Sequence, residues 1–318
     1  MANITSAEIV YVFGPSGAGK SFTGDYMTVV HGYHHIDGDI PYKHMTLVPE
    51  YMEMFEKMII DGDWAPHYSE LAKLTLEAAK EHKKVVLSHA TTHNEPRDHV
   101  IKKLVEGGVS EDNITLIQLT IDPKVQAHGW YHRSKEQLEQ VGSNLTEYVR
   151  AQDQEFEGEV TEEIFVKWFL ENPDNPFRGD DFEDHPNARM VDVSARDVTH
   201  FDNLDMALKL TRSSDLTYED IYSKVKPIDV ARDAKTTGNG FLEAYTEMLA
   251  KAAAKAGDNS LVIDEEGEDE KKVEEMKKRR SSLVQLEGSV RNLSIGDTSE
   301  EARKSRKSFI KTGKVSDE

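Results

Sequence analysis

The sequence predicts an α/β fold, a doubly wound parallel sheet of five strands with helices on both faces. Short runs rich in β-branched and aromatic residues alternate with amphipathic segments, and a glycine-rich turn joins the first run to the first helix. Of the 318 residues, 37% are hydrophobic and 31% are charged, so we expect a packed core with a polar excess. The length suits one large domain or two smaller ones.

The first strand is expected at residues 9–13, which are apolar throughout and end at Gly14, as is typical of a buried strand. After the glycine-rich turn, a helix is expected from residue 21 to about residue 30, and a short second strand at residues 33–36. Helical spacing then predicts two further helices, with faces formed by Met52, Phe55 and Ile59 and by Leu71, Leu74, Ala78 and His82, the second with Pro66 near its start.

The remaining strands are expected at residues 85–87, 114–121 and 189–193. A helix with Val100, Ile101 and Leu104 follows the third strand and ends at Gly107 and Gly108.

A long polar insertion separates the fourth and fifth strands. Residues 123–142 are charged and predicted to be helical, and a second helix carries Ile164, Phe165, Trp168 and Phe169. Residues 172–187 have turn chemistry and are expected at the surface. After Asp205 the chain is expected to be helical to about residue 256.

From residue 257 the composition changes to an acidic block, a basic run and serine-rich segments, which predicts a disordered tail. The predicted units are therefore residues 1–215 as the main domain, 216–256 as a helical extension and 257–318 as the tail. Basic residues precede serines repeatedly in the tail, a pattern that protein kinases could read. A merely solubilising tail is the alternative.

Charge and cysteine content exclude several function classes. Lys and Arg total 39 and Asp and Glu total 59, so the net charge is 39 − 59 = −20, which disfavours nucleic acid and anionic membranes as partners. Cysteine is absent, which excludes disulfides, thiol catalysis and cysteine-ligated metals. No apolar stretch is long enough to span a membrane, and no signal peptide is evident, so a cytoplasmic protein is expected.

The glycine-rich turn fits the phosphate-binding pattern G-x-x-x-x-G-K-[ST] at every fixed position. Glycines let main-chain N–H groups converge on phosphate oxygens, and the following helix adds the positive end of its dipole. The candidate nucleotide-binding residues are Gly14, Ser16, Gly17, Ala18, Gly19, Lys20, Ser21 and Phe22. Lys20 would reach the β- and γ-phosphates, and the Ser21 hydroxyl would bind Mg²⁺. The alternative is a chance glycine turn, or a degenerate loop in an inactive protein.

Two carboxylates, Asp37 and Asp39, follow the second strand, and in a doubly wound sheet that end faces the ligand crevice. We assign Asp37 to the metal and Asp39 to the acceptor hydroxyl, with both near the substrate. An ordinary Asp-Gly-Asp turn is the alternative.

These motifs resemble the gluconokinase group of P-loop small-molecule kinases, which are related to shikimate and nucleoside monophosphate kinases. The matching pieces, in the same order over roughly residues 8–210, are the first strand with its GPSGAGKS loop, residues 36–39, Trp64, residues 85–88, Arg97 with Asp98, and residues 114–119 with Asp122. The resemblance implies a P-loop NTPase fold of the nucleoside monophosphate kinase type, and it supports metal and hydroxyl contacts for the two acids.

The chain departs from that group at three places, one of which is the insertion at residues 145–187, which is longer here. Ser88, His89, Ala90 and Thr91 stand where gluconokinases usually carry Ser-Ala-Leu-Lys, and Ile40, Pro41 and Tyr42 replace their His-Pro pair. The resemblance therefore supports kinase chemistry and does not support gluconate as the acceptor.

The segment after the fourth strand folds over the nucleotide in related kinases, and here it offers Lys124, His132, Arg133 and Lys135. We select Arg133, whose planar fork suits phosphate oxygens; a solvated helix face is the alternative. Arg97 would bind an anionic substrate group or else pair with Asp98 or Glu95 at the surface.

Trp64 and His89 are expected to line the acceptor pocket. No acid ends the third strand, so the metal would depend on Ser21 and Asp37.

The sequence thus predicts an ATP- and Mg²⁺-dependent phosphotransferase that phosphorylates a hydroxyl of a small metabolite. A nucleoside or nucleoside monophosphate kinase is the second enzymatic reading. A non-catalytic nucleotide-binding scaffold with a regulatory tail is the non-enzymatic reading.

Overall fold

The computed structural model describes residues 4–38, 53–54, 57, 63–140, 144–146, 149, 158–171, 182–195, 197–213 and 215–237. Asp39, the helix face formed by residues 52, 55 and 59, and the predicted tail lie outside these residues. The predicted helical extension is described only as far as residue 237.

A five-stranded sheet of parallel strands forms the centre of the fold, with strand order β2-β3-β1-β4-β5. The strands are β1 (Glu8–Phe13), β2 (His34–Asp37), β3 (Lys84–His89), β4 (Ile114–Thr120) and β5 (Arg189–Asp192). This confirms the predicted fold class. β1 lies centrally between β3 and β4, which explains why its sequence is apolar on both faces.

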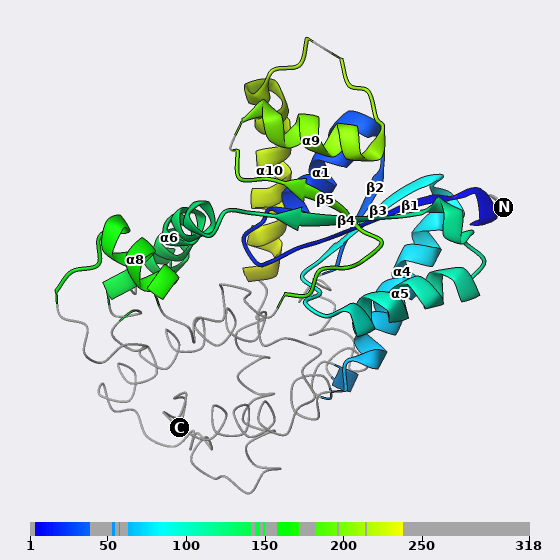
Figure 1. The fold of residues 1–318 in the computed structure, drawn as a ribbon, viewed down its shortest axis with the longest axis horizontal. Coiled ribbons are helices and arrows are strands. Elements are labelled where there is room, and N and C mark those ends of the chain that lie inside the picture. The colour runs from blue at the N-terminus through cyan, green and yellow to red at the C-terminus, as the bar shows by residue number, and fades with distance from the viewer. Residues whose placement is uncertain are drawn as a thin grey trace, which may run out of the picture.

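Helices cover both faces of the sheet (Figure 1). One face carries α1 (Lys20–His31), α9 (Val198–Leu208) and α10 (Tyr218–Thr237), and the other carries α4 (Ala65–Glu81) and α5 (Asn94–Glu106). Two short 3₁₀ turns, Ile4–Ser6 and Glu111–Asn113, precede β1 and β4.

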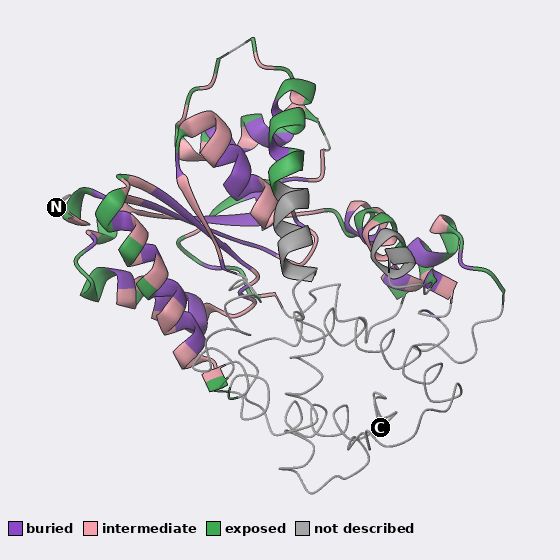
Figure 2. Cartoon of the chain, turned by 180° about the vertical axis from the view of Figure 1, so that it is seen from behind, coloured by how far each residue is buried: buried purple, intermediate pink, exposed green. Residues whose placement is uncertain are grey.

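Alternate residues of the strands enter two separate cores, and Figure 2 shows the strands buried between the helices. In β1, Val10 and Val12 face α1, whereas Tyr11 and Phe13 face α4 and α5. This alternation decides which strand residues share a face with the phosphate loop and its helix.

The insertion after β4 forms a third apolar cluster of its own. It contains α6 (Pro123–Gln140) and α8 (Glu162–Glu171), as the sequence predicts. Trp130 of α6 packs in this cluster with Phe165 and Phe169 of α8. In Figure 1 the two helices lie beyond the end of the sheet.

One expectation from the sequence is wrong. The chain after Asp205 is not continuously helical, because α9 ends at Leu208, Lys209 adopts a left-handed φ of 56°, and α10 starts only at Tyr218. Of residues 172–187, which were expected at the surface, only 182–187 are described; residues 183, 184, 186 and 187 are exposed, whereas His185 is buried and Phe182 packs against the core.

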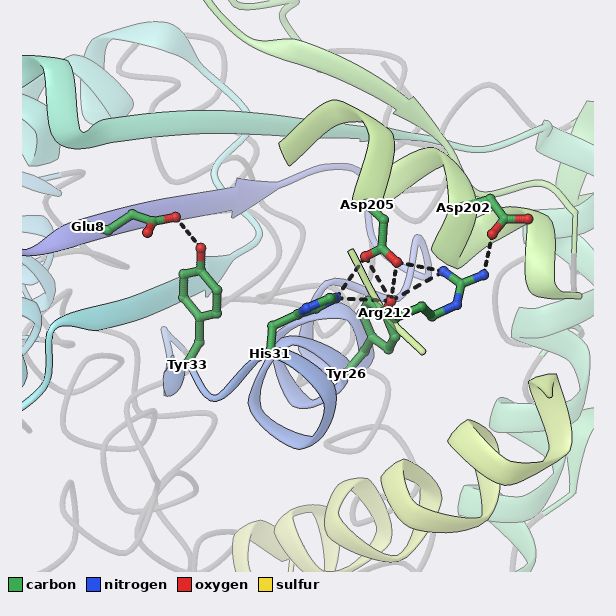
Figure 3. Close-up of polar contacts among 7 residues, drawn as sticks. All are labelled: Glu8, Tyr26, His31, Tyr33, Asp202, Asp205 and Arg212. Carbon is green, nitrogen blue, oxygen red and sulfur yellow. Dashed lines mark hydrogen bonds and ion pairs between the residues drawn. The ribbon is translucent and has the colours of Figure 1, made fainter. Parts of the chain in front are cut away.

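A polar network holds the break between α9 and α10 against the end of α1 (Figure 3). The Asp205 carboxylate accepts from the Tyr26 hydroxyl at 2.8 Å and from the Arg212 guanidinium at 2.6 Å, and it lies 2.8 Å from His31 Nε2. Arg212 also pairs with Asp202. Burial would raise the pKa of Asp205, but the hydrogen bonds from His31, Tyr26 and Arg212 outweigh it and hold that pKa below its usual value.

Candidate phosphate-binding and transfer site

The phosphate loop connects β1 to α1 with two glycines in left-handed backbone conformations. Gly17 has φ 81° and Gly19 has φ 78°, values that side-chain-bearing residues adopt only at a cost. The loop is closed by a hydrogen bond of 3.2 Å from the Ala18 N–H to the Pro15 carbonyl. α1 begins directly after Gly19, so the N–H groups of its first turn are presented at the end of the loop.

The loop fits closely against β4 and α6. A Cβ on Gly14 would lie 2.9 Å from the Leu119 carbonyl oxygen, and one on Gly17 would lie 3.0 Å from Trp130 Nε1. Gln126 of α6 donates from Nε2 to the Ser16 carbonyl at 2.7 Å. α6 thereby buttresses the outer side of the loop.

Lys20 lies back along the loop, with Nζ donating to the Pro15 carbonyl at 3.0 Å. Its ammonium group is therefore beside the N–H groups that would hold phosphate oxygens, as expected for a lysine of this motif. Phe22, another predicted nucleotide-binding residue, packs its ring against Phe201 of α9 at 6.1 Å and Tyr222 of α10 at 5.9 Å.

Asp37 ends β2 on the same side of the sheet as α1. Its Cα partner on β3 is Ser88. Val86, two residues before Ser88 and therefore on the same face of β3, packs in the core under α1. The next residue, Gly38, donates its N–H to the Ser88 carbonyl at 2.6 Å. A Cβ there would lie 2.7 Å from His89 Cβ, so only glycine fits where the chain leaves β2.

The donor set on this side suits Mg²⁺. Ser21 in the first turn of α1 and Asp37 at the strand end offer a hydroxyl and a carboxylate, which are hard oxygen ligands. Magnesium usually keeps several waters and takes one or two protein ligands together with substrate phosphates. Among the described residues no three His, Asp or Glu side chains form a metal-binding group.

The opposite face of the sheet end carries a chain of hydroxyls and imidazoles. His89 contacts the Thr91 hydroxyl through Nδ1 at 2.9 Å, and Thr91 contacts the Tyr11 hydroxyl at 2.7 Å. His67 of α4 approaches His89, with 3.5 Å between the two Nε2 atoms. Burial raises the pKa of Tyr11 to about 12, so this hydroxyl stays protonated at neutral pH.

Trp64 precedes α4 and packs edge-on against Tyr68 and His99, with ring centroids 5.9 Å and 5.4 Å apart. The ring is partly buried against the core of that face. His89 and Trp64 thus both lie on the α4 face of the sheet, opposite the face that carries α1.

Arg97 does not form the surface ion pair that the sequence left open, because it is buried. Its guanidinium is fully buried and lies 4.4 Å from the centroids of both the Phe13 and Phe182 rings. Its five N–H groups donate to the Thr91, Thr92 and Glu183 carbonyls and to Asn94 Oδ1, with Thr91 accepting twice. All its donors are used within the protein, so Arg97 ties the chain after β3 to the chain before β5. Burial lowers its pKa to about 10, which leaves it charged at neutral pH.

Arg133 lies over Trp130, with 5.4 Å between its guanidinium carbon and the ring centroid. Trp130 also faces Gly17, so the same indole ring contacts both Arg133 and the phosphate loop. Gln126, Trp130 and Arg133 are spaced at i, i+4 and i+7, so they form one stripe of α6.

The sequence interpretation missed a polar chain beneath Asp37. His35 Nδ1 lies 2.9 Å from Asp25 Oδ1, and His35 Nε2 lies 2.8 Å from the Ser88 hydroxyl. The available signal was the alternation of His35 and Asp37 along β2, which places both side chains on one face.

Comparisons with known proteins identify solved structures only. No family model matches the chain, and no curated protein matches it. A gluconokinase from Sinorhizobium meliloti 1021 is similar with a TM-score of 0.36 and 17% identity, over 71% of this chain and 98% of that one. A sugar kinase from Janibacter sp. HTCC2649 is similar with a TM-score of 0.38 and 13% identity, over 64% of this chain and 96% of that one.

A chain from the PezAT toxin–antitoxin system of Streptococcus pneumoniae matches with a TM-score of 0.29 and 13% identity, over 71% of this chain and 87% of that one. At these TM-scores the likenesses carry no argument about activity, so function is argued from the residues of this chain. In the described part of the chain, no helix is both long and apolar enough to cross a membrane.

Proposed function

We propose that the protein is an ATP- and Mg²⁺-dependent phosphotransferase that acts on a hydroxyl group of a small metabolite in the cytoplasm. The observation that carries this proposal is the loop between β1 and α1. Two left-handed glycines, a folded-back lysine and a helix N-terminus form a cradle suited to phosphate oxygens. In a chain of net charge −20, this local arrangement provides a place for a polyanion.

Each residue has a separate part in the proposed reaction. The main-chain N–H groups of the loop bind the phosphates, and Lys20 and Arg133 neutralise charge on the transferred phosphoryl group. Ser21 and Asp37 would hold Mg²⁺, which when bound offsets phosphate charge and orients the phosphates. Asp39 orients the acceptor hydroxyl and receives its proton.

The acceptor is proposed to bind on the α4 side of the sheet, near Trp64 and His89, whose rings both pack against Tyr68. The imidazoles of His67 and His89 and the hydroxyl of Thr91 are grouped there. Groups of this kind form hydrogen bonds with hydroxyl-rich molecules.

The proposal is tested by measuring ADP release with a panel of sugar acids, sugars, nucleosides and nucleoside monophosphates. We expect one class of acceptor to accelerate ADP release, and we expect Lys20→Ala to abolish that acceleration. Lys103→Ala is the matched control, because this lysine is on α5, away from the phosphate loop, and pairs with Glu106 on the same helix. Asp39→Asn should keep ATP affinity and lose about 10²-fold or more in turnover. Wild-type turnover in Lys20→Ala would refute the assignment of the loop.

A further inference from the structure

A buried chain of three polar side chains connects α1 to the strand beside Asp37. Asp25 comes from α1, His35 from β2 and Ser88 from β3. Asp25 and Ser88 are 2% and 1% exposed, so the chain lies inside the fold. His35 bridges them, at 2.9 Å from Asp25 Oδ1 and 2.8 Å from Ser88 Oγ.

The packing of α1 is adapted to this imidazole. A Cβ on Gly24 would lie only 2.3 Å from His35 Nε2, so any other residue there would displace the ring. Glycine within a helix is destabilising relative to alanine, and Gly24 lies within α1. That cost is offset here by the close approach of helix and ring.

Burying a carboxylate and an imidazole is an expensive way to attach a helix to a sheet. Val10, Val12 and Val86 pack on the same face, where apolar residues hold α1 without the cost of desolvation. Ser88 is paired with Asp37 in the sheet, toward the end that bears the phosphate loop, whereas the other buried His–Asp pair of α1, His31 with Asp205, lies at the end of the helix remote from it. Its location therefore points to a role at the site.

Ser88 occupies a particular position in this arrangement. It is the Cα partner of Asp37 on one side and of Val12, two residues before the loop, on the other. Many P-loop proteins carry a metal-binding aspartate on a neighbouring strand, whereas β3 ends in Ser88 and His89. A hydroxyl has no charge, but here it is linked through His35 to the Asp25 carboxylate.

Resting on the proposed function, we propose that Asp25 and His35 position the Ser88 hydroxyl as an outer hydrogen-bonding group for the metal held by Ser21 and Asp37. An imidazole that donates from Nδ1 to Asp25 accepts the Ser88 proton at Nε2, which leaves lone pairs of the Ser88 oxygen available as acceptors. Outer-shell partners of this kind orient the groups around a metal, and their loss typically costs 10- to 100-fold in metal affinity.

The test compares ADP binding by calorimetry at saturating Mg²⁺ and in EDTA, using the full chain. We expect Ser88→Ala, His35→Gln and Asp25→Asn to weaken binding about 10-fold or more with Mg²⁺ and to leave binding in EDTA unchanged. Ser88→Thr keeps the hydroxyl and should retain the Mg²⁺-dependent affinity. His31→Gln is the matched control, because it breaks another His–Asp pair on α1, at the end remote from the loop.

The outcomes separate the two proposals. Equal weakening with and without Mg²⁺, or wild-type affinity with Mg²⁺, would show that the three residues only attach α1 to the sheet, and the positioning role would be rejected while nucleotide binding stands. A wild-type protein that binds no nucleotide in either condition would overturn both. Thermal melts of each variant identify loss of folding, and Ser88→Ala, the smallest change, remains informative if the buried charge variants unfold.

Discussion

Comparing Gly19→Ala with Gly32→Ala distinguishes the cost of a strained backbone from a direct effect on phosphate binding by the loop. Gly19 has φ 78°, and Gly32, which ends α1, has φ 70°. A Cβ on Gly19 would meet only Phe22 Cβ at 4.0 Å, and one on Gly32 would meet nothing within 4 Å. Both alanine variants therefore carry the left-handed backbone penalty of about 1–2 kcal/mol and little else.

Since the strain is matched, Gly19→Ala and Gly32→Ala should lower the melting temperature by a similar amount, roughly 2–4 °C per kcal/mol. Only Gly19→Ala places a methyl group on the loop that phosphate oxygens must approach. We expect its affinity for ATP, measured with a fluorescent analogue and competing ATP, to fall by about 10-fold or more, equivalent to about 1.4 kcal/mol. Equal ATP affinities in the two variants would refute the placement of the phosphates against this loop.

Three further perturbations test the surrounding structure. Asp205→Asn should cost about 1–3 kcal/mol at neutral pH in denaturant titrations, because it removes the buried carboxylate that Arg212 and Tyr26 contact, while Arg212 keeps its pair with Asp202. The pKa of Asp205 is lowered by folding, so its contribution is complete above the unfolded pKa of about 4 and is lost as the pH falls through the folded value. The wild type should therefore lose this part of its stability below about pH 4. If the stability of Asp205→Asn fell by the same amount over that pH range, the lowered pKa of Asp205 would be contradicted. Arg97→Lys should lower the free energy of unfolding by about 2–4 kcal/mol, because a lysine ammonium offers three N–H donors in place of the five that the guanidinium now uses. An unchanged midpoint of chemical denaturation would exclude this structural role of Arg97. Arg133→Ala should reduce turnover about 10²-fold with ATP binding retained, whereas Lys135→Ala on the same helix should not; equal turnover in both would remove Arg133 from the reaction.

The parts of the fold that could be predicted are those specified by nearby residues. The apolar run of β1, the glycines of the loop and the helical spacing of α4 each act over a few positions, so pattern and propensity were sufficient. The same holds for the phosphate loop, whose backbone conformation depends on glycines at fixed spacing.

The role of Arg97 could not be predicted because its partners are distant in the sequence. The Glu183 carbonyl and the Phe182 ring come from a segment more than 80 residues away, and only the folded sheet brings them to α5. A charged residue in a polar stretch therefore appeared to be exposed. The burial of His185 in the mostly exposed segment before β5 was not predictable for the same reason, since His185 is held by Asp98 and by the Gln118 side chain.

The break after α9 escaped prediction because it carries no glycine or proline at the helix end. Lys209 takes the left-handed conformation that glycine usually provides, and its N–H still bonds to the Met206 carbonyl at 3.2 Å. The hydrogen bonds of His35 could not be predicted because one of its partners, Asp25, is a buried residue of α1. The alternation of side chains along β2 indicates which face of the sheet His35 lies on, but it does not indicate which residue of the covering helix contacts it.

The most direct test of the central claim is calorimetric titration of ATP with Mg²⁺ into the full chain and into Lys20→Ala. The account predicts saturable binding of one nucleotide per chain in the wild type, and a loss of affinity of 10-fold or more when the ammonium that lies over the loop is removed. Absence of binding heat in a folded wild-type protein, or the same affinity in both proteins, would contradict it.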